Sequence, residues 1–585
     1  MKGKSLTFRG LAASPGVALG YAHQLDRGKV VIARRSVDRD EVAFEIARFN
    51  SALQSARDQL KQLRKKVSDE QGEDHVYLID AQILMLEDRS LTDDTREMIQ
   101  AEGINAEWAV QKSIEQFKKL FDRIDDEYFR DRRSDIEYAE ERLLRLLVGT
   151  KEQGFVSIHR KTVLVAHEIS PADLLKINRE SLSGVTMDGG GRTSHISIIA
   201  RSFGIPMVVG SGMVSFEVQN GERIIVDGTD GVVIVRPEPE VWTAYEAKQK
   251  QYLSARKELL KNRHHKAETK DLYEVHLLAN IDLAEEVEAV LENGAEGVGL
   301  LRTEYAFLGK TLPVTEEEQF ESYKEIVSAL KPRETVIRVL DVAGDSLVGP
   351  PTGFRSDRNP ALGLRGIRFL LQAEEVLRTQ LRAILRASAF GKAAILYPMV
   401  STVEEVRKAN QILRDLKGEL EAQKIPFDRE IRTGTMIEIP SAALSANQFA
   451  AEVDFLSIGT NDLIQYTMAV DRGNELVADL YTPLHGAFIQ LLRRVADLGH
   501  KSAIEVGVCG EMASEPFFIP LLVGMEFNFL SVNAASIPKV KQIIRETTMA
   551  DAKKWVNDVC RMDDTEEIRA YLTACYRKHL PGLWA

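Results

Sequence analysis

Residues 434–462 read GTMIEIPSAALSANQFAAEVDFLSIGTND. Two short apolar runs, residues 434–439 and 455–459, flank a stretch whose apolar residues recur at three- and four-residue spacing. Short apolar runs are typical of buried parallel strands, and the spacing between them indicates a helix. The segment therefore predicts a strand–helix–strand unit with parallel strands.

The same unit repeats on both sides of this segment. From about residue 270 onward, about eight strand-like runs alternate with helical patterns, as a (β/α)₈ barrel requires. An open, doubly wound sheet is the structural alternative. The runs are residues 276–281, 297–301, 335–340, 394–399, 434–439, 455–459, 503–508 and 527–532.

The first 270 residues have a different organisation. Residues 6–21 alternate apolar and small residues around Ser14-Pro15-Gly16, which indicates strand, turn and strand. Residues 38–147 are highly charged with helical spacing, and β-type runs return near residue 157. We expect an α/β domain of residues 1–34 and 152–236 with a helical bundle, residues 35–151, inserted in it. Residues 237–270 would form a charged linker helix, and residues 271–585 the TIM barrel.

The composition limits the class of protein. Of 585 residues, 44% are hydrophobic and 28% charged, which is typical of a soluble globular chain. A net charge of −12 argues against a general nucleic-acid binder. Three cysteines indicate a reducing compartment, and no apolar run approaches the ~20 residues of a membrane span. We expect a cytoplasmic protein without membrane insertion.

Polar residues lie at or just after the ends of several predicted barrel strands. Barrel enzymes build their sites at this end, and charged groups attached to apolar strands need partners or ligands. The residues are Arg302, Arg338, Glu438, Asn461, Asp462, Arg472, Cys509 and Glu511.

These residue types predict a metal and an anion. Two carboxylates, Glu438 and Asp462, suit Mg²⁺, which fills its remaining positions with water and substrate oxygens. Three arginines suit a small substrate that carries phosphate and carboxylate, because the guanidinium fork binds both groups bidentately. The alternative interpretation is a set of salt bridges that stabilises the barrel rim.

A second motif, DGGGRTSH, ends at His195. Its three glycines allow the backbone to turn and expose N–H groups to an anion. Thr193 or Ser194 can cap a helix that runs to about Phe203, which places His195 in the first turn. A neutral imidazole there is a suitable phosphoryl acceptor. The alternative is a plain glycine-rich turn followed by a helix-capping histidine.

Together the motifs resemble enzyme I of the phosphoenolpyruvate:sugar phosphotransferase system, over essentially the whole chain. GGRTSHISIIAR resembles the family's phosphohistidine signature, and SIGTNDLIQYTMAVDRGN resembles its barrel signature. LLRTEY, RAILRASAFG, MIEIPSA and GVCGEMA follow in the family's order, and the SPG turn and DDEYFRDRRSDI also fit.

The resemblance implies a phosphoryl relay. Phosphoenolpyruvate would bind at the barrel through Arg302, Arg338, Arg472 and Asn461, with Mg²⁺ held by Glu438 and Asp462. His195 would take the phosphoryl group, and Cys509 would protonate the enolate. His195 would then phosphorylate a small HPr-type histidine phosphocarrier docked on the helical domain, after the α/β domain swivels. A homodimer through the barrel is expected.

Two segments depart from the family pattern. After the third strand the family usually has Gly-Gly-Asp-Lys, whereas this chain has Ala343-Gly344-Asp345-Ser346, which removes a favourable charge beside the substrate. The following loop also differs up to Asn359-Pro360, although Arg365 stands where the family has an arginine.

Three other functions compete. A nitrogen-type paralogue would serve another carrier, but it usually has an N-terminal sensory domain, for which the early SPG turn leaves no room. A dikinase or phosphoenolpyruvate synthase needs an ATP-grasp domain, which the helical insert is too short to supply. A degenerate regulatory relative would bind without turnover, and Ser346 motivates that alternative.

Overall fold

The computed structural model describes residues 4–25, 32, 34–38, 40–71, 83, 86, 89–121, 140, 142–148, 161–169, 181–191, 195–307, 314–342, 359–471 and 477–580. The chain divides into two compact units: unit 1, Met1–Arg256, and unit 2, Lys257–Ala585.

Unit 2 is a closed barrel of eight parallel strands, β9 to β16, in which each strand pairs with the next and β16 pairs with β9. This confirms the predicted TIM barrel, and every predicted strand run overlaps an observed strand. The strands are β9 His276–Ile281, β10 Val298–Leu301, β11 Glu334–Arg338, β12 Lys392–Tyr397, β13 Arg432–Ile437, β14 Phe455–Ile458, β15 Glu505–Val508 and β16 Phe529–Asn533.

Alternation along the strands produces two cores. Residues such as Val336, Met436 and Phe455 form a small cluster, whereas Ile337, Ile437 and Leu456 belong to the large cluster shared with the helices. Because successive side chains in a strand point to opposite faces, the small cluster fills the barrel interior and the large one lies between strands and helices. Arg338 and Glu438 continue the interior register beyond Val336 and Met436.

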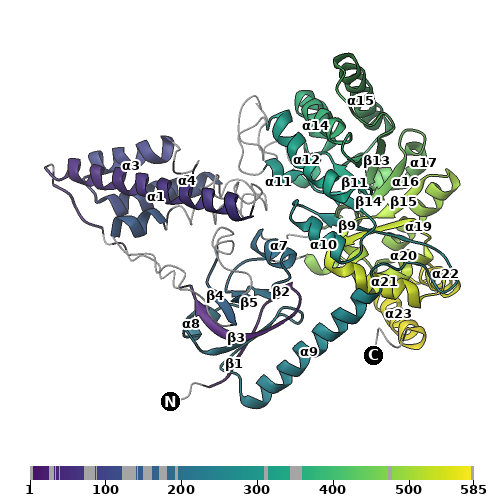
Figure 1. Cartoon of the computed structure of the whole chain (residues 1–585), viewed down its shortest axis with the longest axis horizontal. Helices are drawn as coiled ribbons and strands as arrows, with labels where there is room; N and C mark the ends of the chain where they lie inside the picture. The colour runs from purple at the N-terminus through teal and green to yellow at the C-terminus, as the bar shows by residue number, and fades with distance from the viewer. Residues whose placement is uncertain are drawn as a thin grey trace. The chain divides into compact units, whose positions relative to one another are not determined.

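Helices surround the barrel strands (Figure 1). Helix α12 begins with a capping box in which Thr315 and Glu318 bond reciprocally. The helices are α10 Glu286–Glu292, α11 Glu304–Phe307, α12 Glu316–Leu330, α13 Ile367–Gln372, α14 Glu374–Ala387, α15 Val403–Gln423, α16 Pro440–Leu444, α17 Ala446–Phe449, α18 Thr460–Met468, α19 Gly486–Lys501, α20 Ile519–Gly524, α21 Ile537–Glu546, α22 Met549–Val559 and α23 Thr565–His579.

Unit 1 contains an eight-stranded mixed sheet in the order β1-β8-β7-β3-β4-β5-β6-β2. The segment between β3 and β4 holds helices α1, α3 and α4, which is the predicted insertion of a helical bundle into an α/β fold. The elements are β1 Leu6–Arg9, β2 Leu11–Ser14, β3 Val17–Gln24, α1 Val42–Gln71, α3 Arg89–Glu102, α4 Ala106–Phe121, β4 Thr162–Ala166, β5 Leu182–Met187, α7 His195–Ser202, β6 Met207–Val209, α8 Val214–Glu217, β7 Arg223–Asp227 and β8 Val232–Val235.

Helix α9, Pro239–Lys261, follows the sheet and has no buried residue. Polar and apolar contacts nevertheless tie it to the sheet: the Lys248 ammonium pairs with Asp227 and with Asp230, the latter at 2.5 Å. Trp242 and Tyr245 pack against the cluster that includes Val17. Among the helices that the structure describes, none is long and apolar enough to cross a membrane.

Candidate active site at the carboxyl end of the barrel

The sequence-predicted polar residues that the structure describes gather at one end of the barrel. Arg302 follows β10, Arg338 ends β11, Glu438 follows β13, and Cys509 follows β15, while Asn461 and Asp462 open α18 directly after β14. Because all eight strands are parallel, these positions share the carboxyl end. Arg472 and Ser346 lie outside the described residues.

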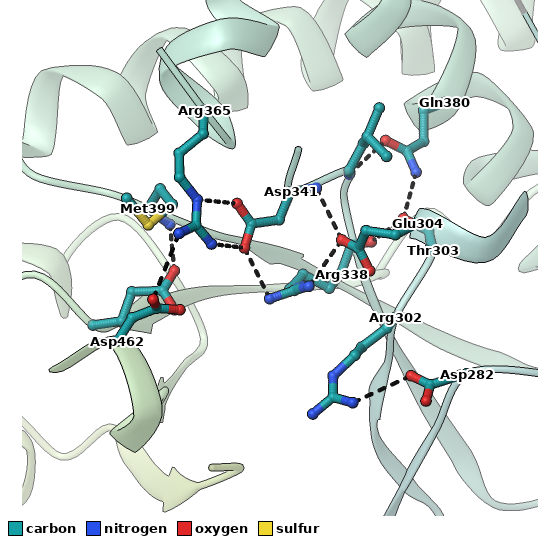
Figure 2. A network of polar contacts seen from close by, with 12 residues as sticks. Asp282, Arg302, Thr303, Glu304, Arg338, Asp341, Arg365, Gln380, Met399 and Asp462 are labelled. Atoms are coloured by element: carbon teal, nitrogen blue, oxygen red, sulfur yellow. Dashed lines mark hydrogen bonds and ion pairs between the residues drawn. The ribbon is translucent and has the colours of Figure 1, made fainter. Parts of the chain in front are cut away.

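A chain of charge pairs crosses this end of the barrel (Figure 2). Asp341 lies between two guanidinium groups: Arg365 donates to it through Nε at 3.1 Å and Nη2 at 2.9 Å, and Arg338 donates through Nη1 at 3.0 Å. Arg338 also pairs with Glu304 at 2.8 Å, and Arg365 with Asp462 at 3.5 Å. Two arginines and three carboxylates are thereby held in one network.

Burial makes this network electrostatically strong. The Asp341 side chain is 1% exposed and that of Arg338 is 12% exposed. Although burial alone would lower the pKa of Arg338, the carboxylates of Glu304 and Asp341 raise it. Both arginines therefore remain charged, and their planar forks are fixed before any anion arrives.

Glu438 is a second buried carboxyl group of the site, with 1% of the residue exposed. Its Oε1 accepts a hydrogen bond from the Met399 backbone N–H at 2.6 Å. Burial and the neighbouring charges of Asp462 and Asp341 raise the pKa of Glu438 to about 8. Glycine at position 459 leaves room for this side chain, since a Cβ there would stand 2.7 Å from Glu438 Oε2. The site thus holds more carboxyl groups than guanidinium groups, and Glu438 keeps its proton more readily than an ordinary carboxyl.

A hard divalent cation fits this arrangement. Among the described residues, no group of three or more His, Cys, Asp or Glu could hold a metal ion. The pair Glu438 and Asp462 supplies two carboxylates whose mutual repulsion a cation would relieve, and magnesium commonly uses one or two carboxylates. The donor set therefore fits a metal that keeps coordination positions for water and substrate.

Arg302 stands beside a second acidic group. Its Nη1 lies 3.4 Å from Asp282 Oδ1, and its side chain is 35% exposed. Glu286 accepts hydrogen bonds from the backbone N–H groups of Asp282 and Leu283. Burial and the Asp282 charge raise the pKa of Glu286 to about 8. The exposed part of the Arg302 side chain gives an anion access to it.

Cys509 belongs to the interior barrel cluster and is 1% exposed. Its thiol donates to the Ile458 carbonyl at 3.6 Å, and its own carbonyl accepts from Asn280 Nδ2 at 2.9 Å. Burial raises the pKa of the Cys509 thiol to about 11. At neutral pH the thiol therefore carries its proton.

Asn461 is held on both its main chain and its side chain. The amide Oδ1 accepts the Glu511 backbone N–H at 3.0 Å, and the main-chain carbonyl accepts the Tyr481 hydroxyl at 3.1 Å. Because Oδ1 is engaged in this way, the orientation of the amide is fixed.

The predicted phosphoryl acceptor, His195, belongs to unit 1. His195 is the first residue of α7, in the first turn where the capping motif predicts it. Its side chain lies outside the described residues. Gly190 has a φ of +94°, which favours glycine, and the Ser197 hydroxyl donates to the Gly191 carbonyl at 2.8 Å. The helix ends before Gly204, whose φ is +64°.

Three acidic residues were not predicted from the sequence: Asp282, Glu304 and Asp341. Each lies one to three residues after a barrel strand, so the strand-end rule that found the arginines also applies to them. The signal was present in LLRTEY and VIRVLD, where a carboxylate follows each arginine within three residues.

Family models identify the general class of this protein, the PEP-utilising enzymes. Three family models match: PEP-utilising enzyme, N-terminal, over residues 9–132; PEP-utilising enzyme, mobile domain, over residues 158–231; and PEP-utilising enzyme, PEP-binding domain, over residues 256–549. The last covers the barrel and its network. PEP-utilising enzymes are a metal-dependent family.

Individual relatives identify the family within this class of enzymes. The chain is 40% identical over 568 residues to the phosphoenolpyruvate-protein phosphotransferase of Priestia megaterium, covering 97% of this chain and 99% of that protein. It is 37% identical over 569 residues to that of Bacillus subtilis (strain 168), with the same coverage. A solution structure of Enzyme I covers 42% of this chain and 99% of its own at 33% identity, with a TM-score of 0.37. The chain belongs to the phosphoenolpyruvate-protein phosphotransferase family.

Proposed function

We propose that this enzyme transfers the phosphoryl group of phosphoenolpyruvate to its own His195 and then to a histidine of an HPr-type phosphocarrier protein. This is the first step of the sugar phosphotransferase system. The observation that carries the proposal is the 40% identity to a phosphoenolpyruvate-protein phosphotransferase along 97% of the chain. The arginine–carboxylate network at the barrel supports it chemically.

The substrate is bound through its two anionic groups. Arg302, Arg338 and Arg472, with Asn461, hold the phosphate and carboxylate of phosphoenolpyruvate. Guanidinium groups recognise both groups with paired hydrogen bonds, and Arg338 is already fixed by Glu304 and Asp341. Fixing donors in advance lowers the reorganisation that the transition state requires.

Glu438 and Asp462 hold Mg²⁺. When bound, the cation neutralises negative charge on the substrate oxygens. The chain's own carboxylates supply the site: the Met399 N–H orients Glu438, and Arg365 lies 3.5 Å from Asp462.

The chemistry exchanges one bond to phosphorus for another. The bond between phosphorus and the enol oxygen breaks, and a bond to an imidazole nitrogen of His195 forms. The enolate that leaves accepts a proton on carbon from the Cys509 thiol and becomes pyruvate. Because the barrel and His195 belong to different units of the chain, the cycle requires the α/β domain to swivel toward and away from the barrel. We further propose that the enzyme is a cytoplasmic homodimer through its barrel.

Intact-protein mass at neutral pH tests the first half of this relay. After phosphoenolpyruvate and Mg²⁺ are added, the chain should gain one acid-labile phosphoryl group. The gain should disappear with chelator and in His195→Ala, whose fold and Mg²⁺ binding should be intact. A well-folded chain that gains no mass would contradict phosphoryl transfer, and full labelling of His195→Ala would remove His195 from the mechanism.

A further inference from the structure

A glutamine occupies a core position on α14, and the proposed reaction does not use it. Gln380 is 0% exposed, and its neighbours Leu377, Leu381 and Ile384 are also fully buried. A buried side-chain amide is unfavourable unless it is hydrogen-bonded. Its partners therefore explain why a polar residue occupies this position.

The partners of Gln380 lie just beyond the ends of two barrel strands, β10 and β11, and in the middle of one helix, α12. Gln380 Oε1 accepts the Leu340 backbone N–H at 2.9 Å. Its Nε2 donates to the Thr303 hydroxyl at 3.1 Å and to the Tyr323 hydroxyl at 3.0 Å. Thr303 in turn donates to the Arg338 carbonyl at 2.9 Å. Figure 2 shows Gln380 beside Thr303. With the bond to Tyr323, one side chain joins the carboxyl ends of β10 and β11 to α12.

The backbone groups that Gln380 holds adjoin the residues that bind the substrate in the proposed function. Thr303 follows Arg302, and Leu340 precedes Asp341, which fixes Arg338 and Arg365. The β11–β12 ladder ends with the bond from the Val339 N–H to the Leu396 carbonyl, so the Leu340 N–H is held by Gln380 instead.

We propose that Gln380 is a positioning residue that sets the spacing of Arg302, Arg338 and Asp341 for the anionic substrate. It does not touch the substrate. It holds two strand ends at a fixed separation and therefore fixes where the guanidinium groups converge. The inference rests on the proposed function for the identity of the substrate, phosphoenolpyruvate.

Three variants of the full chain test it. Gln380→Met keeps the length of the side chain and removes all three bonds. Thr303→Val removes the link from Gln380 to β10, together with the Thr303 bond to the Arg338 carbonyl, and leaves the Leu340 bond. Tyr323→Phe is the matched control, because it removes a buried hydrogen bond of Gln380 and leaves both strand ends attached. All three should lower the unfolding temperature, so stability alone does not separate a positioning role from a structural one.

The separating readout is kcat/KM for phosphoenolpyruvate in autophosphorylation, with Kd measured in a His195→Ala background. We expect Gln380→Met and Thr303→Val to lower kcat/KM by about 10-fold or more and to raise Kd, since small displacements of binding groups are costly. Tyr323→Phe should stay within about twofold, because the strand ends remain attached. Equal losses in all three variants, or an unchanged Gln380→Met, would overturn the proposal. If Gln380→Met does not fold, Thr303→Val against Tyr323→Phe decides it.

Hydrogen exchange separates this proposal from the proposed function. Amide exchange at Leu340 and Asp341 should accelerate in Gln380→Met and remain slow in Tyr323→Phe, whether or not phosphoenolpyruvate is the substrate. If the unmodified chain takes up no phosphoryl group, the proposed function fails. If these two amides exchange equally in both variants, the positioning role fails.

Discussion

The two ends of the barrel both carry arginines and carboxylates, but these groups differ in how far they are buried and in how they are paired. At the amino end, Arg432 pairs with Glu334 at 3.2 Å and with Glu505, and its guanidinium lies 5.1 Å from the centre of the Phe455 ring. The Arg432 side chain is 36% exposed. Arg432 and its two partners, Glu334 and Glu505, all reach water, so they form a solvent-exposed set of ion pairs.

At the carboxyl end, charged groups share partners, and water is largely excluded around Arg338, Asp341 and Glu438. Asp341 serves two arginines, and Glu438 is buried beside Asp462 and Asp341, which helps to raise its pKa to about 8. The buried Nε of Arg338 has no hydrogen-bond partner among the described residues. Such imbalance lowers stability and is expected where a ligand completes the site. The amino end is arranged for stability and the carboxyl end for binding.

The strongest test of this difference is Glu438→Gln. The amide can still accept the Met399 N–H but cannot serve as an anionic metal ligand, so we expect phosphoryl uptake to slow by about 10³-fold. With chelator present, the same change should raise the unfolding temperature by about 2 °C, because the neutral amide avoids the cost of holding a buried carboxyl that would ionise in the unfolded chain. The gain should grow as pH rises from the ordinary range of a carboxyl toward 8, where Glu438 ionises.

Mass spectrometry with phosphoenolpyruvate and thermal unfolding check both halves of this prediction. Asp454, a carboxylate near the amino end, provides a control: its Oδ2 accepts the Thr433 N–H at 2.7 Å. Asp454→Asn should leave phosphoryl uptake intact. A less stable Glu438→Gln would contradict the view that the buried carboxyl groups at this end lower the stability of the fold.

Arg432→Gln is the opposite experiment, on the end arranged for stability. It leaves Glu334 and Glu505 without their shared cation and removes the contact with Phe455, so we expect a loss of about 1 kcal/mol in unfolding free energy. Phosphoryl uptake should stay within about twofold, because β13 separates Arg432 from Glu438 by roughly 20 Å. Denaturant unfolding measures the first effect and intact mass the second. A large loss of phosphoryl uptake without unfolding would show that the two ends are coupled.

The fold was predictable because the barrel repeats one local pattern. The spacing of apolar residues and the turn signals located all eight strands. The predicted end of the third strand was wrong for a physical reason. The third run was predicted as residues 335–340, but β11 ends at Arg338. Beyond β11 the Leu340 backbone N–H donates to Gln380 on α14 instead of to a neighbouring strand. This partner lies forty residues away, and no local sequence pattern specifies it.

The site was predictable in part, for the same reason. The strand-end rule found Arg302, Arg338, Glu438 and Asp462, because each residue's position depends on its own strand. It did not reveal that Asp341 would serve two arginines, since that sharing depends on how separate loops converge. Gln380 was missed because its spacing places it on the apolar face of α14, where sequence indicates only a core position.

The smallest effect concerns the pH dependence of the amino end. His276 Nδ1 lies 2.7 Å from Glu296 Oε2, and this hydrogen bond raises the pKa of His276 above its ordinary value of 6.5. A raised histidine pKa stabilises the fold fully below 6.5, and that contribution is lost as pH rises through the folded value. Because the side chain is 55% exposed, the contribution should be a few tenths of a kcal/mol.

His276→Gln measures this contribution, since the amide can still donate to Glu296 without carrying a charge. Unfolding of both chains should be compared at pH 6 and pH 9 in parallel. We expect the variant to be less stable than the unmodified chain at pH 6 and nearly equal to it at pH 9, with phosphoryl uptake unaffected at either pH. A stability difference that persists at pH 9 would mean that the packing of the imidazole, rather than its charge, accounts for it. The amino end would then contribute to the barrel by shape as well as by ion pairing.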